Sequence, residues 1–99
     1  QKVIAVPDEF ALHQNYPNPF NPVTTIQYDI PKETHVNLIV YDILGREVKT
    51  LLNQKEQPGY KSIRWNGKNN AGQKVSAGMY FYRFETTGFV DVHKMILLK

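Results

Sequence analysis

Residues 24–42 read TTIQYDIPKETHVNLIVYD and contain the two clearest strand patterns of the chain. In the first pattern apolar and polar residues alternate, so that one face of an extended segment carries Ile26, Tyr28 and Ile30. Pro31 ends this segment. The second pattern, at 35–42, repeats the alternation and places on its inner face Val36, Leu38 and Val40. This stretch therefore predicts two half-buried β-strands.

Further strand patterns follow at intervals of about ten residues. Asp42 to Gly45 supplies a turn in which Gly45 is free to take a positive φ, and we expect the returning strand at 46–52. Beyond a polar loop that ends in Pro58-Gly59, the other expected strands are 60–65, 79–86 and 89–99, with a short one at 10–14. No stretch has a convincing helical period. About seven short strands with turn residues between them predict an all-β, antiparallel β-sandwich.

One local pattern supports an immunoglobulin-like topology for this sandwich. The run Ser76-x-Gly78-x-Tyr80-x-Tyr82 resembles the tyrosine corner of immunoglobulin domains, with a tyrosine where antibody domains place a cysteine. This interpretation predicts inward-pointing side chains at Tyr80, Tyr82 and Phe84.

An unusual stretch, NYPNPFNP at 15–22, precedes the first clear strand. Each X-Pro step pushes the preceding residue toward extended geometry, and asparagine side chains bond to the nearby backbone and stabilise turns. We expect a stiff segment in which Tyr16 and Phe20 are the side chains large enough to anchor it to a core. Residues 1–9 are expected to be a linker, and residues 10–99 the folded domain.

Length and composition exclude several classes of protein. The 99 residues fit one domain, and the absence of cysteine removes thiolate catalysis, disulfides and cysteine-ligated zinc. The 12 Lys and Arg residues are scattered among 9 Asp and Glu residues, which argues against a nucleic-acid partner. No apolar run approaches the roughly 18 residues of a membrane span, so we expect no membrane insertion. The chain begins at Gln1 without a signal-peptide pattern, and we expect it to be the C-terminal piece of a longer protein.

Residues that could carry catalysis or bind a metal are scattered. The three histidines, His13, His35 and His93, lie in unrelated stretches, and their spacing does not match that of zinc ligands. The loop at 66–72 offers no carboxylate for calcium, only Asn66, Asn69 and Asn70. No nucleophile motif, phosphate loop or acid/base pair of carboxylates is evident. We therefore expect a domain that is not an enzyme and has no metal site and no cofactor.

The terminal segment KMILLK at 94–99 departs from the alternation of the other strands. Both of its faces are predicted to be apolar, one with Met95 and Leu97 and the other with Ile96 and Leu98. A sandwich of this size normally keeps one face of each sheet in water. Two explanations stay open: coverage by the N-terminal segment or a neighbouring domain, and a docking surface, either an apolar patch or a strand edge.

Several motifs occur in an order that resembles one known family. They are YPNPFNP at 16–22, TTIQYDIP at 24–31, VYDILGREV at 40–48, W-N-G at 65–67, the A-G-x-x-V-x-x-G-x-Y-x-Y run at 71–82, and KMILLK. Together they closely resemble the type A C-terminal sorting domain of proteins exported by the type nine secretion system. Related immunoglobulin-like modules of flagellar hook-capping proteins share the W-D-G and G-x-Y segments but do not ordinarily begin with this Asn-Pro stretch. Asn66 stands where that pattern usually has Asp.

This resemblance implies a noncatalytic signal that directs a cargo through the periplasm and outer membrane of a Gram-negative bacterium to the surface or the medium. The implied partners are the outer-membrane secretion machinery with its sorting peptidase, and an upstream cargo domain to which residues 16–22 form a rigid entry. Recognition by the machinery is implied for Lys94, Met95, Ile96, Leu97, Leu98 and Lys99. The family-motif positions are Tyr16, Pro17, Asn18, Pro19, Phe20, Asn21, Pro22, Gly45, Arg46, Trp65, Gly67, Gly78 and Tyr80.

Two other function classes stay open. Trp65 and a surface-facing Phe81 motivate a carbohydrate-binding or spacer module of a secreted hydrolase. A hook-cap-like assembly module is the third possibility, and it would associate with itself.

Overall fold

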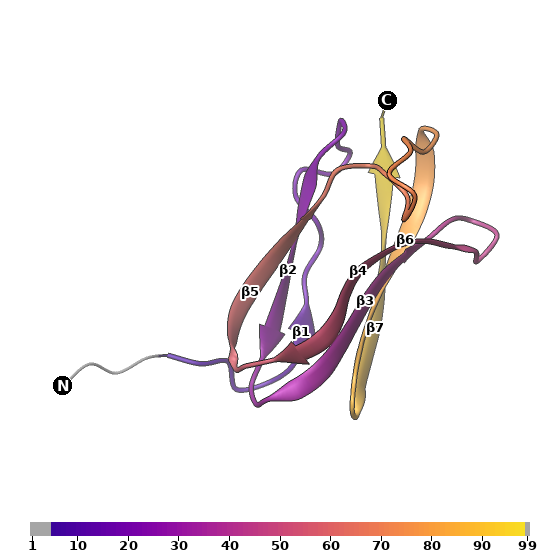
Figure 1. The fold of residues 1–99 in the computed structure, drawn as a ribbon. Coiled ribbons are helices and arrows are strands. Elements are labelled where there is room, and N and C mark those ends of the chain that lie inside the picture. The colour runs from indigo at the N-terminus through magenta and orange to yellow at the C-terminus, as the bar shows by residue number, and fades with distance from the viewer. Residues whose placement is uncertain (1–4, 99) are drawn as a thin grey trace.

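The computed structural model describes residues 5–98, which form two antiparallel sheets packed face to face (Figure 1). The strands are β1 (Ala11–Leu12), β2 (Thr24–Ile30), β3 (Thr34–Tyr41), β4 (Glu47–Glu56), β5 (Gly59–Trp65), β6 (Gly78–Thr86) and β7 (Phe89–Leu97). The three-stranded sheet has the order β1-β2-β5, and the four-stranded sheet has the order β4-β3-β6-β7. The predicted β-sandwich is confirmed. No helix within residues 5–98 is long and apolar enough to cross a membrane.

The core lies between the sheets and follows the predicted alternation. None of its apolar side chains is more than 7% exposed. They include Ile26, Tyr28 and Ile30 of β2, Val36, Leu38 and Val40 of β3, Tyr80, Tyr82 and Phe84 of β6, and Met95 and Leu97 of β7. Each large apolar side chain buried in this way stabilises the fold by about 1.5–3 kcal/mol relative to exposure.

Strand β4 is longer than the sequence pattern predicted. The expected strand ended at residue 52, but β4 continues through Glu56, and its polar residues pair with β3 as far as Thr34. Because β4 is the edge strand of its sheet, residues 53–55 can join the ladder while their side chains stay exposed to water. The predicted polar loop is therefore reduced to the short turn before β5.

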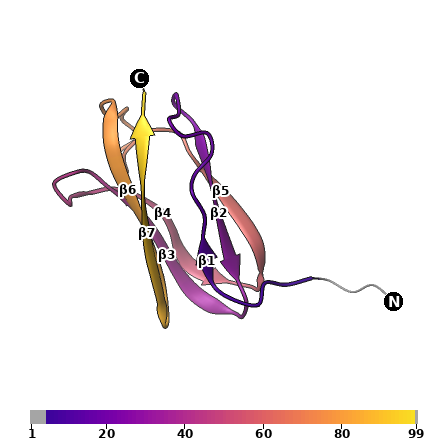
Figure 2. The ribbon, with the colours of Figure 1, turned by 180° about the vertical axis from the view of Figure 1, so that it is seen from behind.

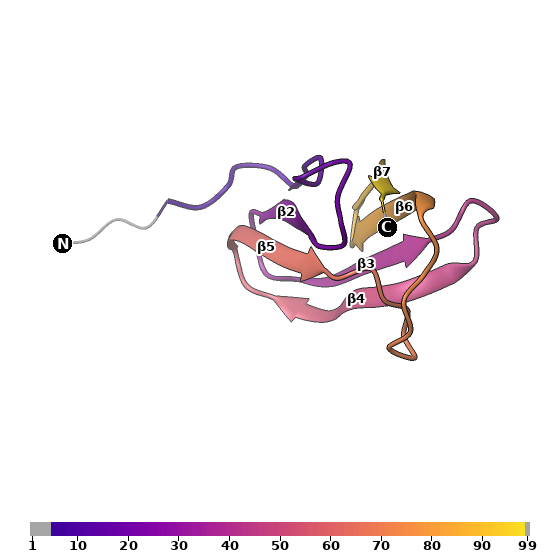
Figure 3. The same ribbon diagram turned by 90° about the horizontal axis from the view of Figure 1, so that it is seen from above.

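The segment from β1 to Phe20 connects the two sheets. It pairs with β2 through β1 and again through Tyr16, which bridges Thr25, and it then reaches the four-stranded sheet, where Phe20 bridges Leu97 in parallel. Figures 2 and 3 show this indigo-to-purple segment passing between β2 and β7 along one side of the sandwich. The peptide bonds that precede Pro17, Pro19 and Pro22 of the Asn-Pro stretch are cis. Only part of the anchoring prediction is confirmed, since Phe20 is 1% exposed but Tyr16 is 81% exposed.

The described chain starts at the other end of the sandwich. There Asp8, Glu9 and Phe10 line a shallow hollow together with Pro31, Lys32 and Phe89, and the rings of Phe10 and Phe89 stack with centroids 5.7 Å apart. β1 then carries the chain along the sandwich toward the end at which β7 finishes (Figure 1). The Asn-Pro stretch therefore closes the far end of the domain. The resemblance had implied that this stretch forms the entry to the domain, but the described chain enters at the opposite end.

Gly67 lies where three distant segments meet. It is buried and has a φ of +74°, a left-handed conformation that glycine adopts without the steric cost of a side chain. A Cβ at this position would lie 3.3 Å from the carbonyl oxygen of Pro22 and 3.6 Å from Cδ2 of Leu97. Glycine is thus required both by the backbone conformation and by the approach of its neighbours.

We predict that Gly67→Ala destabilises the domain more than Gly45→Ala. Gly45 has a similar φ of +82°, but no atom lies within 4 Å of the added Cβ, so this matched variant has only the conformational cost of about 1–2 kcal/mol. Gly67→Ala should lose about 1 kcal/mol more, because Pro22 or Leu97 must move. Denaturant unfolding of the two variants measures the difference, and equal losses would contradict the proposed packing.

Candidate functional site

Three motif residues from different strands and loops form a buried aromatic cluster. The ring centroids of Phe20 and Trp65 are 5.8 Å apart, and those of Trp65 and Tyr80 are 5.5 Å apart. The Trp65 indole also donates a hydrogen bond to the Lys68 carbonyl oxygen at 2.9 Å. Trp65 is 1% exposed, so the idea that it stacks on sugars is wrong. Its role is to join the Asn-Pro stretch to the core.

The predicted tyrosine corner is present. The Tyr80 hydroxyl donates a hydrogen bond of 2.6 Å to the Ser76 carbonyl oxygen, four residues upstream, which is the arrangement that the Ser76-x-Gly78-x-Tyr80 pattern predicted. Burial, and to a smaller extent the charge of Asp42, raises the pKa of Tyr80. The hydroxyl therefore stays protonated and holds the start of β6.

The turn with Gly45 and Arg46 lies beside this corner. Asp42 organises the turn, because its Oδ1 accepts hydrogen bonds from the Leu44 and Arg46 backbone amides and its Oδ2 accepts one from Arg46 Nε at 2.8 Å. These bonds, led by that from the Arg46 amide, lower the pKa of Asp42. A shallow cavity of about 340 Å³ separates the turn from Gly78 and Tyr80. Two motifs about thirty residues apart in sequence thus meet at the end of the sandwich where β7 finishes.

The structure divides the six terminal residues implied in recognition. Met95 is 0% exposed and Leu97 is 3% exposed, so both belong to the core and lie out of reach of a partner of the folded domain. Lys94, Ile96 and Leu98 are exposed. Lys99 lies outside the described residues.

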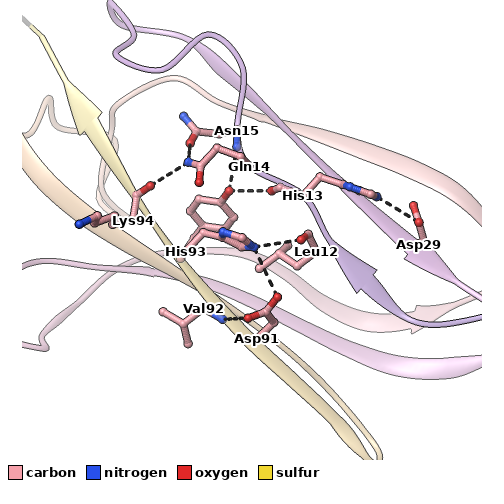
Figure 4. A network of polar contacts seen from close by, with 10 residues as sticks. Leu12, His13, Gln14, Asn15, Asp29, Asp91, Val92, His93 and Lys94 are labelled. Atoms are coloured by element: carbon pink, nitrogen blue, oxygen red, sulfur yellow. Dashed lines mark hydrogen bonds and ion pairs between the residues drawn. The ribbon is translucent and has the colours of Figure 1, made fainter.

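The backbone edge of β7 is covered by the chain's own N-terminal segment. The Phe20 amide donates to the Ile96 carbonyl oxygen at 3.0 Å, and the Phe20 carbonyl oxygen accepts from the Leu98 amide at 2.8 Å. Side-chain amides complete this cover, since the Ile96 amide donates to Asn18 Oδ1 at 3.0 Å and Gln14 Nε2 donates to the Lys94 carbonyl oxygen at 2.8 Å (Figure 4). Coverage by the N-terminal segment therefore explains the edge of the terminal strand, but it leaves the outward face open.

A buried polar network ties the same segment to β6. The Tyr82 hydroxyl donates to the His13 carbonyl oxygen at 2.7 Å and accepts from the Asn15 amide at 2.8 Å. Asn15 is 2% exposed, and its Nδ2 donates to Thr24 Oγ1 at 2.9 Å. Figure 4 shows His13 and Asn15 of this network near His93, whose ring nitrogen lies 3.0 Å from the Leu12 carbonyl oxygen. Sequence reasoning missed Asn15, because nothing local distinguishes a buried asparagine from the exposed ones of the same stretch.

The asparagine side chains considered for metal binding make hydrogen bonds within the protein. Within residues 5–98 no three His, Asp or Glu side chains come together as a metal site. In the Asn-rich loop, Asn69 Oδ1 accepts hydrogen bonds from the Ala71 and Gln73 amides, and Asn70 Oδ1 accepts one from the Thr50 amide. Asn69 thus shapes the loop itself and Asn70 holds it against β4, and both side-chain oxygens have partners within the protein.

Residues 22–88 match the family described as the FlgD Ig-like domain. The chain belongs to this family. The match leaves out residues 16–21 of the Asn-Pro stretch and the whole of β7. A comparison with curated protein sequences finds no match.

Solved structures share the fold of this FlgD Ig-like domain. Dimeric latent PorU from Porphyromonas gingivalis aligns with a TM-score of 0.72 and 24% identity over 98% of this chain and 10% of PorU. PorZ is described as an essential surface component of the type-IX secretion system of that organism. It aligns with a TM-score of 0.58 and 17% identity over 93% of this chain and 12% of PorZ. FlgD from P. aeruginosa aligns with a TM-score of 0.59 and 20% identity over 77% of this chain and 66% of FlgD. The chain thus spans about a tenth of PorU and PorZ, and at these identities the likeness establishes the fold.

We predict that Asn18→Ala exposes the Ile96 amide. This amide loses its acceptor, so its hydrogen exchange should accelerate by roughly fivefold or more, as expected for a bond worth about 1 kcal/mol. Asn21→Ala is the matched control, because Asn21 also precedes a proline in the same stretch and is exposed. Exchange measured by NMR should change at Ile96 in the first variant only, and an unchanged rate there would contradict the edge cover.

A second prediction concerns alkaline pH. Burial raises the pKa of Tyr82 from 10.0 to about 12, so the neutral hydroxyl contributes stability that is complete below pH 10 and is lost between pH 10 and 12. Tyr82→Phe should lower the free energy of unfolding by about 1–3 kcal/mol at neutral pH and flatten this alkaline decline. Tyr16→Phe removes an exposed hydroxyl and should behave like the wild type. Denaturant unfolding across this pH range tests both variants, and an equally steep decline in Tyr82→Phe would contradict the assignment.

Proposed function

We propose that this FlgD Ig-like domain is a noncatalytic C-terminal signal that directs a cargo protein through the type nine secretion system. The cargo would pass through the periplasm and the outer membrane of a Gram-negative bacterium to the cell surface or the medium. The partners in this proposal are the outer-membrane secretion machinery, its sorting peptidase and an upstream cargo domain. The ordered set of motifs from Tyr16 to the terminal strand is the sequence feature that supports it.

One structural observation carries the proposal. Two segments that lie outside the FlgD family match, residues 16–21 and residues 89–98, contact each other, through Phe20 on Ile96 and Leu98 and through Asn18 on Ile96. This pairing lies outside the part of the chain that the family match covers, and it is the feature on which the proposal rests. The likeness to PorU and PorZ supports the same view, because it covers 98% and 93% of the chain, against 77% for FlgD.

A hook-cap-like assembly module is the second candidate function. The family match over residues 22–88 and the likeness to the FlgD structure favour it. A module of this kind works by associating with copies of itself or with other subunits of an assembly. It therefore predicts self-association of the isolated chain at moderate concentrations, whereas a secretion signal that acts on a machine has no need of it.

The test of the leading proposal is a fusion of residues 1–99 to the C-terminus of a periplasmic reporter, in a bacterium that has the type nine system. We expect the reporter at the cell surface or in the medium, and we expect it to stay in the periplasm when the fused domain is omitted or the system is inactivated. Retention of the intact fusion in the periplasm would refute the proposal. Deleting residues 94–99 is a poor control, because it also removes Met95 and Leu97 from the core.

Sedimentation of the isolated chain tests the second candidate. A monomer argues against the assembly module, and reversible oligomers together with failed export would favour it over the secretion signal.

A further inference from the structure

Apolar side chains gather on the outward face of the four-stranded sheet where β6 and β7 lie. Its side chains lie in rows across the strands, with Met79 beside Ile96, Phe81 between Tyr41 and Lys94, and Arg83 between Ile39 and Val92. Five apolar residues are 40–50% exposed, namely Met79, Ile96, Val92, Val90 and Leu98. We define the apolar outer face as Ile39, Tyr41, Met79, Phe81, Val90, Val92, Ile96 and Leu98. An antiparallel sheet with one wet face normally places polar side chains at such positions, so this face indicates a binding surface.

The neighbouring edge of β7 is a poor site for a partner strand. Gln14, Asn18 and Phe20 cover it from residue 94 to residue 98. Farther back, the Val92 amide donates to the side chain of its own neighbour, Asp91, at 2.8 Å. A partner that added a strand here would have to displace these bonds, whereas a partner that packs on the sheet face displaces only water.

Lys94 determines what kind of partner fits. It lies in the row of Phe81 and between Val92 and Ile96 on its own strand, and within residues 5–98 it makes no ion pair. Two other cations of the outward face already have carboxylate partners, since Arg83 contacts Glu85 at 2.8 Å and Lys55 contacts Glu33 at 3.8 Å. A partner that covers the face removes water from the Lys94 ammonium, so it must bring a carboxylate to compensate the charge.

Two other occupants fit less well. A second copy of this chain would bring another Lys94 and another neutralised Arg83–Glu85 pair. The other carboxylate it offers here, that of Glu47 opposite Tyr41 on the edge strand β4, already accepts hydrogen bonds from Thr50 and Asn70. An anionic membrane surface attracts clusters of several basic residues, and this face offers a single uncompensated one.

We propose that the apolar outer face is a docking surface for an apolar protein surface that presents a carboxylate to Lys94. The inference rests on the proposed secretion function, within which that surface belongs to the export machinery. Recognition then depends on Ile96, Leu98 and Lys94 together with Met79 and Val92 of the same face, while Met95 and Leu97 only hold the strand in place.

The test uses the reporter fused to residues 1–99. The double variant Val92→Thr/Ile96→Thr keeps β-forming residues but removes apolar surface, and Lys94→Glu reverses the charge. Tyr60→Thr is the matched control, because Tyr60 is a 66% exposed aromatic residue on the outward side of β5 in the other sheet. Export should fall roughly tenfold or more in the two outer-face variants and stay within about twofold of wild type in the control, since anchors at a docking surface carry most of its affinity.

Unfolding midpoints, sedimentation and vesicle binding complete the test. All of the altered side chains are exposed, so the midpoints should stay close to wild type, and Lys94→Gln provides a milder variant of the same position. Normal export of the intact fusion and of all outer-face variants would overturn the docking surface and leave the secretion function standing. Loss of export by the intact fusion would overturn both. Self-association that Val92→Thr/Ile96→Thr abolishes would assign the face to a second copy. Binding to vesicles of phosphatidylcholine with phosphatidylglycerol that Lys94→Glu abolishes would assign it to lipid. Either result would overturn the proposal.

Discussion

The pairing of Phe20 with the terminal strand is the constraint on which this end of the domain depends. Its backbone satisfies the edge of β7, and its ring packs on Trp65 in the core. Because one residue does both, the Asn-Pro stretch cannot leave the strand edge without also opening the core. Gly67 is required by the same arrangement, since Pro22 and Leu97 approach its backbone from two sides.

Because of this pairing, the edge and the two faces of the terminal strand have different surroundings. The edge is covered by the chain itself, the inner face carries core residues, and only the outward face remains accessible. Unpaired edges are the usual sites of unwanted strand pairing, so a domain with a covered edge can present apolar side chains on a face with less risk of aggregation. A surface of this kind suits the proposed recognition of the folded domain by a partner protein.

The FlgD family match and the contact between Phe20 and the terminal strand concern different parts of the chain. The FlgD family match accounts for the middle of the sandwich, including the tyrosine corner and the turn organised by Asp42. The segments outside it are joined to each other across the side of the sandwich. A shared immunoglobulin-like core can therefore serve more than one function, and the distinguishing features lie where the two ends of the domain meet.

The amino-acid sequence by itself determined the fold class, the strands and most of the core, because alternation at 24–30, 35–42 and 79–86 records directly which side chains are buried. It also predicted the tyrosine corner, whose hydrogen bond spans only four residues. The tertiary structure alone decided that Tyr16 faces solvent, that Asn15 is buried, and that β4 extends through Glu56. It likewise decided which face of the terminal strand is free. Those features depend on contacts between segments up to eighty residues apart, and no local pattern of side chains specifies which distant segment will cover an edge or a face.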